Sequence, residues 1–115
     1  MGVVYHANYF QYFEVGRTEL IRALGCTYAD MERDGIRLPV VETSARFHAP
    51  ARYDDVLVLE TRIASVSAVR VRFLYVVRRD GDDAVLAEGH TVLASVAEDG
   101  RPRRLPKEMR ALLVP

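Results

Sequence analysis

The sequence is poor in the features that mark secreted, membrane-spanning and nucleic-acid-binding proteins. Its one cysteine, Cys26, cannot form an intrachain disulfide and has no metal-ligand spacing around it. Sixteen basic residues balance sixteen acidic ones, so a generally basic nucleic-acid-binding protein is not expected. No apolar run approaches the roughly 18 residues that span a bilayer, and no secretory signal is visible. We therefore expect a cytoplasmic protein without a membrane span.

What is present is typical of one small globular domain over residues 1–115. Half of the residues are hydrophobic and 28% are charged, which argues against intrinsic disorder. A chain of this length buries roughly two-thirds of its unfolded surface, which leaves little room for a deep pocket of its own. Small chains that act on a sizeable substrate often build the site between subunits.

A wide apolar stripe predicts a helix over residues 8–24. Its members recur at three- and four-residue steps: Phe10, Phe13, Leu20, Ile21 and Leu24. Asn8 is suited to be the N-cap residue, with Gln11 completing a capping box, and Gly25 is suited to end the helix. A stripe of this width is unusual for a helix that lies on a surface, so we expect other elements to wrap around it.

After a second short helix over residues 27–31, the hydrophobic period changes to two, which is typical of strands. We expect strands at about residues 38–48, 56–63, 69–77 and 86–96, and a terminal helix over residues 106–113. Turn-forming residues separate the last three strands, so hairpins are expected between them. This order predicts an α+β domain in which a long, curved antiparallel β-sheet surrounds the aromatic helix.

The segment ahead of the first helix is the first candidate for a reactive site. A glycine-led turn brings Tyr5 and His6 to the start of the helix at Asn8. Backbone N–H groups at a helix N-terminus are unpaired and lie at the positive end of the helix dipole. They suit a carbonyl oxygen that becomes negative during acyl transfer. A structural Tyr–His pair in a glycine loop is the competing interpretation.

Motifs over nearly the whole chain resemble those of hotdog-fold acyl-CoA thioesterases of the 4-hydroxybenzoyl-CoA thioesterase family. The branch associated with the bacterial Tol-Pal system is the most similar. The matching runs are Gly2 to His6, Asn8-Tyr9, Phe13-Glu14, Arg17, Leu38 to Val41, Pro50 to Asp55, and Gly100 to Arg103 with Pro106. The resemblance implies a hotdog fold, a homodimer or homotetramer with sites between subunits, and hydrolysis of acyl-CoA thioesters. It implies no metal and no other cofactor.

The chain departs from the family pattern at its first residue. The resemblance places the family's catalytic aspartate, which acts as nucleophile or as general base, two residues ahead of Met1. We therefore expect the natural protein to start upstream, so that this chain lacks that aspartate and most of the first β-strand. If the short chain is complete, the alternative is a non-catalytic module that binds an acyl thioester or a partner. A hotdog hydratase would need a differently placed Asp–His pair, which we do not find.

Two residues are candidates for catalysis. His6 matches the family position whose backbone N–H polarises the thioester carbonyl, with direct action of its imidazole as a base as the alternative. If the short chain is genuine, Glu14 is the second candidate, because a more distant group of hotdog thioesterases carries its catalytic carboxylate on this helix. An ion pair with Arg17, or a contact between subunits, is the competing role for Glu14.

Other residues are candidates for binding. Tyr5, Asn8 and Tyr9 are candidates for contact with the substrate. The competing role is helix capping for Asn8 and core packing for the two tyrosines. Arg70 and Arg72, on the exposed face of a strand, are candidates for the phosphates of CoA. A second basic cluster lies in the tail, at Arg101, Arg103, Arg104, Lys107 and Arg110. A solvated charged edge is the competing role for most of these arginines.

Overall fold

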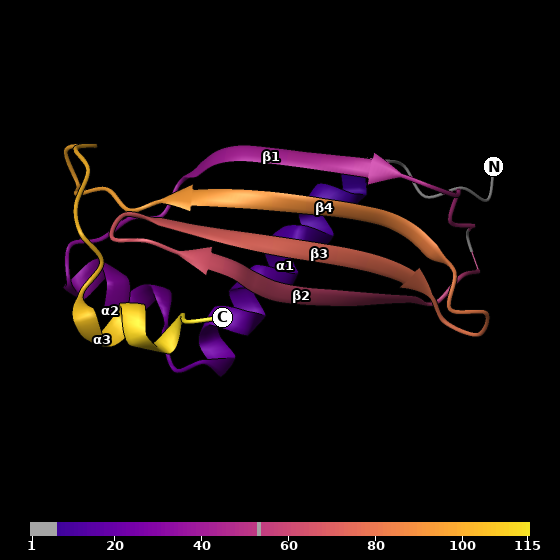
Figure 1. Cartoon of the computed structure of the whole chain (residues 1–115), viewed down its shortest axis with the longest axis horizontal. Coiled ribbons are helices and arrows are strands. Elements are labelled where there is room, and N and C mark those ends of the chain that lie inside the picture. Colours follow the sequence, from indigo (N-terminus) through magenta and orange to yellow (C-terminus); the bar gives the residue numbers. More distant parts are fainter. Residues whose placement is uncertain (1–6, 53) are drawn as a thin grey trace.

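The computed structural model describes residues 7–52 and 54–115, which form three helices and four strands. Helix α1 spans Ala7–Ala23 and α2 Tyr28–Arg33; strand β1 spans Val40–Phe47, β2 Leu57–Val66, β3 Arg70–Arg79 and β4 Val85–Ala94; helix α3 spans Lys107–Leu112. In Figure 1, α1 lies behind the sheet and crosses its strands obliquely, and α2 and α3 lie together at one end. This arrangement confirms the predicted α+β domain with an antiparallel sheet.

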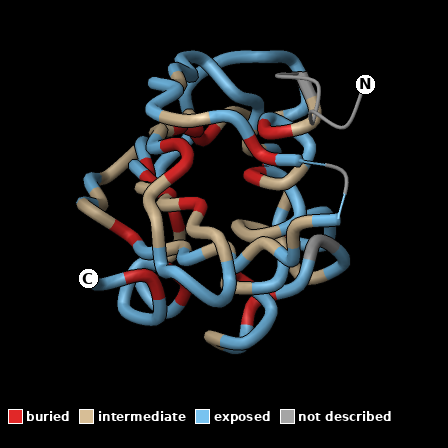
Figure 2. The backbone as a smooth tube through the Cα atoms, turned by 90° about the vertical axis from the view of Figure 1, so that its right-hand side faces the viewer, coloured by how far each residue is buried: buried red, intermediate tan, exposed pale blue. Residues whose placement is uncertain are grey.

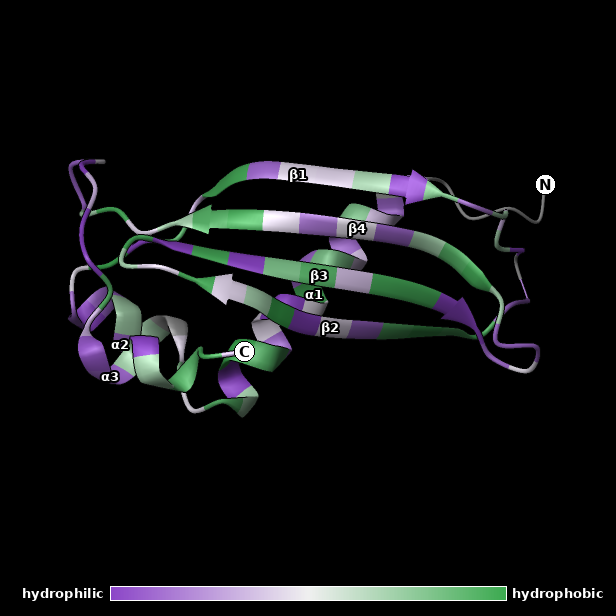
Figure 3. Cartoon of the chain, viewed as in Figure 1, coloured by the Kyte–Doolittle hydropathy of each residue, from purple (hydrophilic) through white to green (hydrophobic). Residues whose placement is uncertain are grey.

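The four described strands form one antiparallel sheet in the order β1-β4-β3-β2. The β2–β3 and β3–β4 pairs are hairpins, as the turn residues predict, and β1 joins the far side of β4. Along the strands, hydrophobic and hydrophilic residues alternate, as Figure 3 shows most clearly on β3. One face of the sheet therefore packs against α1, while the other carries the charged side chains.

The ends of the two first helices follow local capping rules. Gly25 has a positive φ of 101°, and the N–H groups of Gly25 and Cys26 donate to the carbonyls of Arg22 and Ile21. This is a Schellman ending of α1, as the sequence predicts. Thr27 and Asp30 form a reciprocal capping box at the start of α2.

One predicted cap is wrong. Helix α1 begins at Ala7, so Asn8 lies inside its first turn and is not the N-cap residue. The helical backbone begins two residues further upstream than an N-cap at Asn8 would allow, and the cap position falls outside the described residues. The side chain of Asn8 is half-buried there.

Aromatic rings form one half of the core between α1 and the sheet. Phe13 stacks on Tyr75 with a ring-centroid distance of 4.3 Å, and Phe73 lies next to Tyr75 on β3 at 6.5 Å. Tyr9 packs between Tyr12 and Phe47 at 5.8 Å and 5.5 Å. Figure 2 shows the buried residues on segments that enclose the interior of the molecule. These rings fix the position of the N-terminal half of α1 on the sheet.

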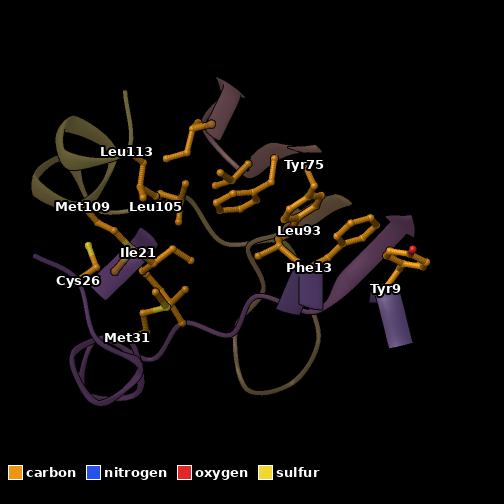
Figure 4. Close-up of a cluster of buried hydrophobic side chains, with 14 of the residues drawn as sticks. Tyr9, Phe13, Ile21, Cys26, Met31, Tyr75, Leu93, Leu105, Met109 and Leu113 are labelled. Carbon is orange, nitrogen blue, oxygen red and sulfur yellow. The ribbon is translucent and has the colours of Figure 1, made fainter. Parts of the chain in front are cut away.

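Aliphatic and sulfur-containing side chains form the other half of the core. Ile21, near the C-terminal end of α1, is surrounded by residues from α2, α3 and the segment ahead of α3. The group comprises Cys26, Met31, Leu105, Met109 and Leu113 (Figure 4). The terminal helix therefore covers the end of the core that the sheet leaves open.

Two glycines allow α1 to lie close to the sheet. A Cβ atom on Gly89 of β4 would stand 2.6 Å from Cε2 of Phe13 and 2.6 Å from the carbonyl oxygen of Ser44. A Cβ atom on Gly16 of α1 would meet the side chains of Thr61 and Leu59 on β2. The helix crosses the sheet at a separation that larger side chains at these two positions would not permit.

The sheet covers one side of α1, and residues of α2 and α3 pack around its C-terminal end, so the prediction that other elements wrap this helix is confirmed in part. Phe10 is 40% exposed and Val15 is 55% exposed on the remaining surface. None of the helices in the described part of the chain has both the length and the apolar character needed to cross a membrane.

Arg79 links the β1–β2 loop to the β3–β4 turn, at the end of the sheet away from α2 and α3 (Figure 1). Its guanidinium donates to Asp55 Oδ2 at 3.1 Å, to Asp82 Oδ2 at 2.9 Å and to the carbonyl of Pro50 at 3.1 Å. Asp55 also accepts the N–H of Arg52 at 2.8 Å. That backbone hydrogen bond first, and then Arg79, hold the pKa of the Asp55 carboxyl below its usual range.

Replacing Asp55 by asparagine should lower the midpoint of thermal unfolding at neutral pH, because the amide cannot pair with Arg79. The native pKa is depressed, so the stabilisation is complete above about pH 4 and is lost as the pH falls through the native pKa. The difference between the wild type and Asp55→Asn should therefore shrink in acid. Asp54→Asn is the matched control, since Asp54 is exposed and forms none of the ion pairs seen among the described residues. A difference that stays constant into strong acid would contradict this account.

Candidate active site

A groove of about 240 Å³ lies between the N-terminal half of α1 and the edge of the sheet formed by β1 and β4. Its lining residues are Phe10, Gln11, Phe13, Glu14 and Arg17 of α1, Val40 and Thr43 of β1, and Thr91 of β4. Aromatic rings and polar groups therefore meet in one cleft.

Helical and strand geometry bring these residues together. Residues three and four apart share one face of a helix, so Phe10, Glu14 and Arg17 project to the same side of α1. The rings of Phe10 and Phe13 meet edge to face at 6.0 Å. On the sheet, Thr43 of β1 pairs directly with Thr91 of β4. Both threonines therefore line the groove from the side of the sheet that faces α1.

The polar groups of the groove differ in what they contact. Glu14 is exposed, and no ion pair found among the described residues joins it to Arg17, so that competing role is not realised in this chain. The hydroxyl of Thr43 donates to the carbonyl of His90 at 3.2 Å. Thr91 is only 1% exposed, and within residues 7–52 and 54–115 its hydroxyl has no hydrogen-bond partner. Among the described residues, the groove thus holds a carboxylate without an ion pair and a buried hydroxyl without a hydrogen bond.

The other predicted residues near the N-terminus fall elsewhere. Tyr9 is 2% exposed and packs in the aromatic core, which favours its packing role. Burial first, and then the nearby Tyr12 and Asp55, raise the pKa of the Tyr9 phenol above its usual value. Tyr5 and His6 lie outside the described residues.

Arg70 and Arg72 lie on the opposite face of the sheet from Glu14. They alternate along β3 with the buried residues Val71 and Phe73, which face α1. Together they line a separate hollow on the outer face with Glu42, Ser65, Val66, Ser67 and Val92. A single chain therefore does not bring the predicted CoA-binding arginines next to the groove.

A second groove of about 400 Å³ runs along the other side of α1, beside β2. It is lined by Tyr12, Val15, Arg52, Asp55, Leu57, Leu59 and Val77. Its carboxylate, Asp55, already accepts hydrogen bonds from Arg52 and Arg79. This groove is apolar but has no uncommitted acid, so the groove beside Glu14 is the stronger candidate for hydrolytic chemistry.

Thr91 is the groove residue that the sequence analysis missed. A signal was present, because Thr91 occupies an inward position of β4 between otherwise small or apolar inward neighbours. Among the residues that the structure describes, no group of three or more histidine, cysteine or acidic side chains is placed to hold a metal ion.

Comparison with known proteins places the chain in a family. The sequence profile described as "Thioesterase superfamily" matches residues 1–86. The Bacillus subtilis protein YneP is 41% identical over 75 residues, so the match spans 65% of this chain and 54% of that relative. The acyl-CoA thioester hydrolase YbgC of Escherichia coli O157:H7 is 30% identical over 111 residues, which are 96% of this chain and 82% of YbgC.

Solved structures agree with the profile. The hypothetical protein TT1821 of Thermus thermophilus has a TM-score of 0.87 and 36% sequence identity to this chain. The match covers 98% of this chain and 85% of TT1821. A hotdog arrangement of one helix against an antiparallel sheet is therefore shared over nearly the whole described structure. The chain belongs to the thioesterase superfamily.

Proposed function

We propose that this protein hydrolyses acyl-CoA thioesters to a free acid and CoA. The observation that carries the proposal is the exposed carboxylate of Glu14 beside the rings of Phe10 and Phe13, in a groove between helix and sheet. Membership of the thioesterase superfamily supports the reaction class, and the name of the relative YbgC supports CoA as the leaving group.

In this proposal, each part of the groove has a role. The aromatic wall holds the acyl group, and Glu14 acts as the general base for water or attacks the thioester carbon itself. The developing negative charge on the carbonyl oxygen is stabilised by backbone N–H groups at the start of α1, where the sequence places His6. His6 lies outside the described residues, so its role stays a prediction, as does that of the family aspartate.

The size of the groove favours a small acyl group. Sites for drug-sized ligands typically measure about 300–1,000 Å³, and this groove measures about 240 Å³. The part of the site that one chain forms therefore fits a short aliphatic chain or a single aromatic ring, and we propose these as the substrate class.

We infer that a second copy of the chain pairs along β1 and completes the site. Strand β1 is an edge of the described sheet, and its apolar residues Val40, Val41 and Phe47 are 43%, 51% and 38% exposed. An exposed hydrophobic edge strand is a template for pairing. Val40 also lines the groove, so the partner would lie beside the acyl group. Arg70 and Arg72 remain proposals for CoA, which must pass around a sheet edge to reach them.

Release of free thiol from a panel of acyl-CoAs tests the function. We expect turnover of butanoyl-CoA and benzoyl-CoA, with much slower turnover of palmitoyl-CoA, and sedimentation of the same preparation should show a dimer or a larger oligomer. A lack of thiol release from every acyl-CoA would overturn the proposal. Binding without turnover would then favour the alternative of a non-catalytic acyl-thioester-binding module, and a monomer would contradict pairing along β1.

A further inference from the structure

We propose that the buried hydroxyl of Thr91 selects acyl groups that carry an oxygen substituent, such as a hydroxyl or keto group, over plain hydrocarbon acyl groups. The inference rests on the proposed function, because Thr91 lines the same groove as Glu14. It goes further by naming the chemical feature of the acyl group that the groove recognises.

The first support is the unsatisfied state of the Thr91 hydroxyl. Thr91 is 1% exposed, and its Oγ1 has no hydrogen-bond partner in the part of the chain that the structure describes. Its cross-strand neighbour Thr43, with which it pairs directly, instead donates to the carbonyl of His90. Most buried hydroxyls in folded proteins have a partner, so an orphan at a groove indicates a partner supplied from outside the chain.

The second support is the apolar setting of that hydroxyl. Thr91 pairs on its other side with Phe73, which is fully buried, and Phe13 lines the same groove from α1 with 1% exposure. Glu14, by contrast, is exposed. Thr91 is therefore the deep polar group of the groove, and Glu14 lies nearer its mouth.

Among the other buried hydroxyls of the described residues, those of Thr61 and Ser95 also have no hydrogen-bond partner, and neither residue lines this groove. Thr61 lies on β2, where α1 approaches at Gly16, and Ser95 follows β4. Their burial is explained by close packing of the chain. Of these three hydroxyls of the described residues, that of Thr91 alone belongs to a residue that lines the groove.

The consequence for specificity follows from desolvation. Thr91 Oγ1 is already almost closed to water, so a hydrocarbon chain in the groove leaves that hydroxyl unpaired. An oxygen substituent at the same depth restores a hydrogen bond, with Thr91 donating to it or accepting from it. A site built in this way discriminates against the analogue that lacks the oxygen by about tenfold or more.

Matched substrates and matched variants test the inference. The substrates are butanoyl-CoA and its β- and γ-hydroxylated forms, and the variants are Thr91→Val, which keeps the shape, and Thr91→Ser, which keeps the hydroxyl. The wild type should prefer at least one hydroxylated form by about tenfold in kcat/KM. Thr91→Val should lose that preference, with a larger fall in kcat/KM for the hydroxylated forms than for butanoyl-CoA, and Thr91→Ser should keep the preference.

Thermal unfolding separates the inference from a purely structural role for Thr91. Under the inference, Thr91→Val should unfold at the same temperature as the wild type or higher, because it removes an unpaired buried hydroxyl. An equal loss of kcat/KM on all three substrates, or an unchanged preference in Thr91→Val, would overturn the inference. So would a wild type without any preference, because a bound water would then satisfy the hydroxyl.

Binding separates this inference from the proposed function. Thioether analogues of the same acyl-CoAs cannot be hydrolysed, and calorimetry measures their affinities directly. Discrimination in binding without hydrolysis of the parent thioesters would contradict the proposed function and support the role of Thr91. Hydrolysis without discrimination in rate or binding would support the proposed function and contradict the role of Thr91.

Discussion

Replacing Glu14 by glutamine should lower kcat for acyl-CoA hydrolysis by about 10²–10⁴-fold, the range expected for loss of a general base. The amide has the same shape as the carboxylate but accepts no proton. Glu14 is exposed and forms none of the ion pairs seen among the described residues, so the variant should fold as the wild type does. Thiol release at saturating acyl-CoA, together with thermal unfolding, checks both statements.

Glu19→Gln is the matched control for this prediction. Glu19 is an exposed acid on the same helix, and it does not line the groove. The control should hydrolyse acyl-CoA at the wild-type rate. If Glu14→Gln also keeps that rate, Glu14 is not the catalytic carboxylate. The contribution of the aspartate that the family pattern places ahead of Met1 is a separate question, tested by comparing kcat of this chain with that of a chain extended with the upstream codons.

Replacing Gly89 by alanine should lower the free energy of unfolding by about 1–3 kcal/mol, the usual cost of overpacking a core. For a domain of this size, each kcal/mol lowers the melting temperature by about 4–8 °C. The new Cβ would stand 2.6 Å from both Phe13 Cε2 and the Ser44 carbonyl oxygen. The ring of Phe13 must then leave its stacked position on Tyr75, 4.3 Å away, or β1 must shift.

A double variant identifies which of these two contacts matters. Phe13→Leu removes the ring atoms nearest to the new methyl group. Gly89→Ala should therefore cost less stability in the Phe13→Leu background than in the wild type. Additive losses would assign the cost to the Ser44 carbonyl and hence to β1. Wild-type stability in Gly89→Ala would show that the close approach of α1 is not required.

The regular elements of this protein could be predicted because their signals are local. The step of three and four residues in α1 and the step of two in the strands follow from the geometry of each element alone. The same holds for Gly25, whose positive φ ends α1, and for the capping box of Thr27 and Asp30. Each of these features depends on residues within one or two turns of each other.

Predictions about the surroundings of a residue were less accurate. The apolar stripe included Phe10, which is 40% exposed, whereas the substrate candidate Tyr9 is 2% exposed in the core. Helical periodicity identifies a face of the helix, but the direction in which α1 crosses the sheet decides which part of that face is covered. That direction depends on close packing at Gly16 and Gly89, which periodicity does not reveal.

Periodicity, turn residues and motifs are local features of the chain, and they were enough to predict the elements, their order, the antiparallel hairpins and the likeness to thioesterases. The groove shared by Glu14 and Thr91, and the position of Arg70 and Arg72 on the opposite face, became visible with the folded chain. These residues come from segments far apart in the sequence. Their proximity depends on strand register and on the packing of α1 against one face of the sheet.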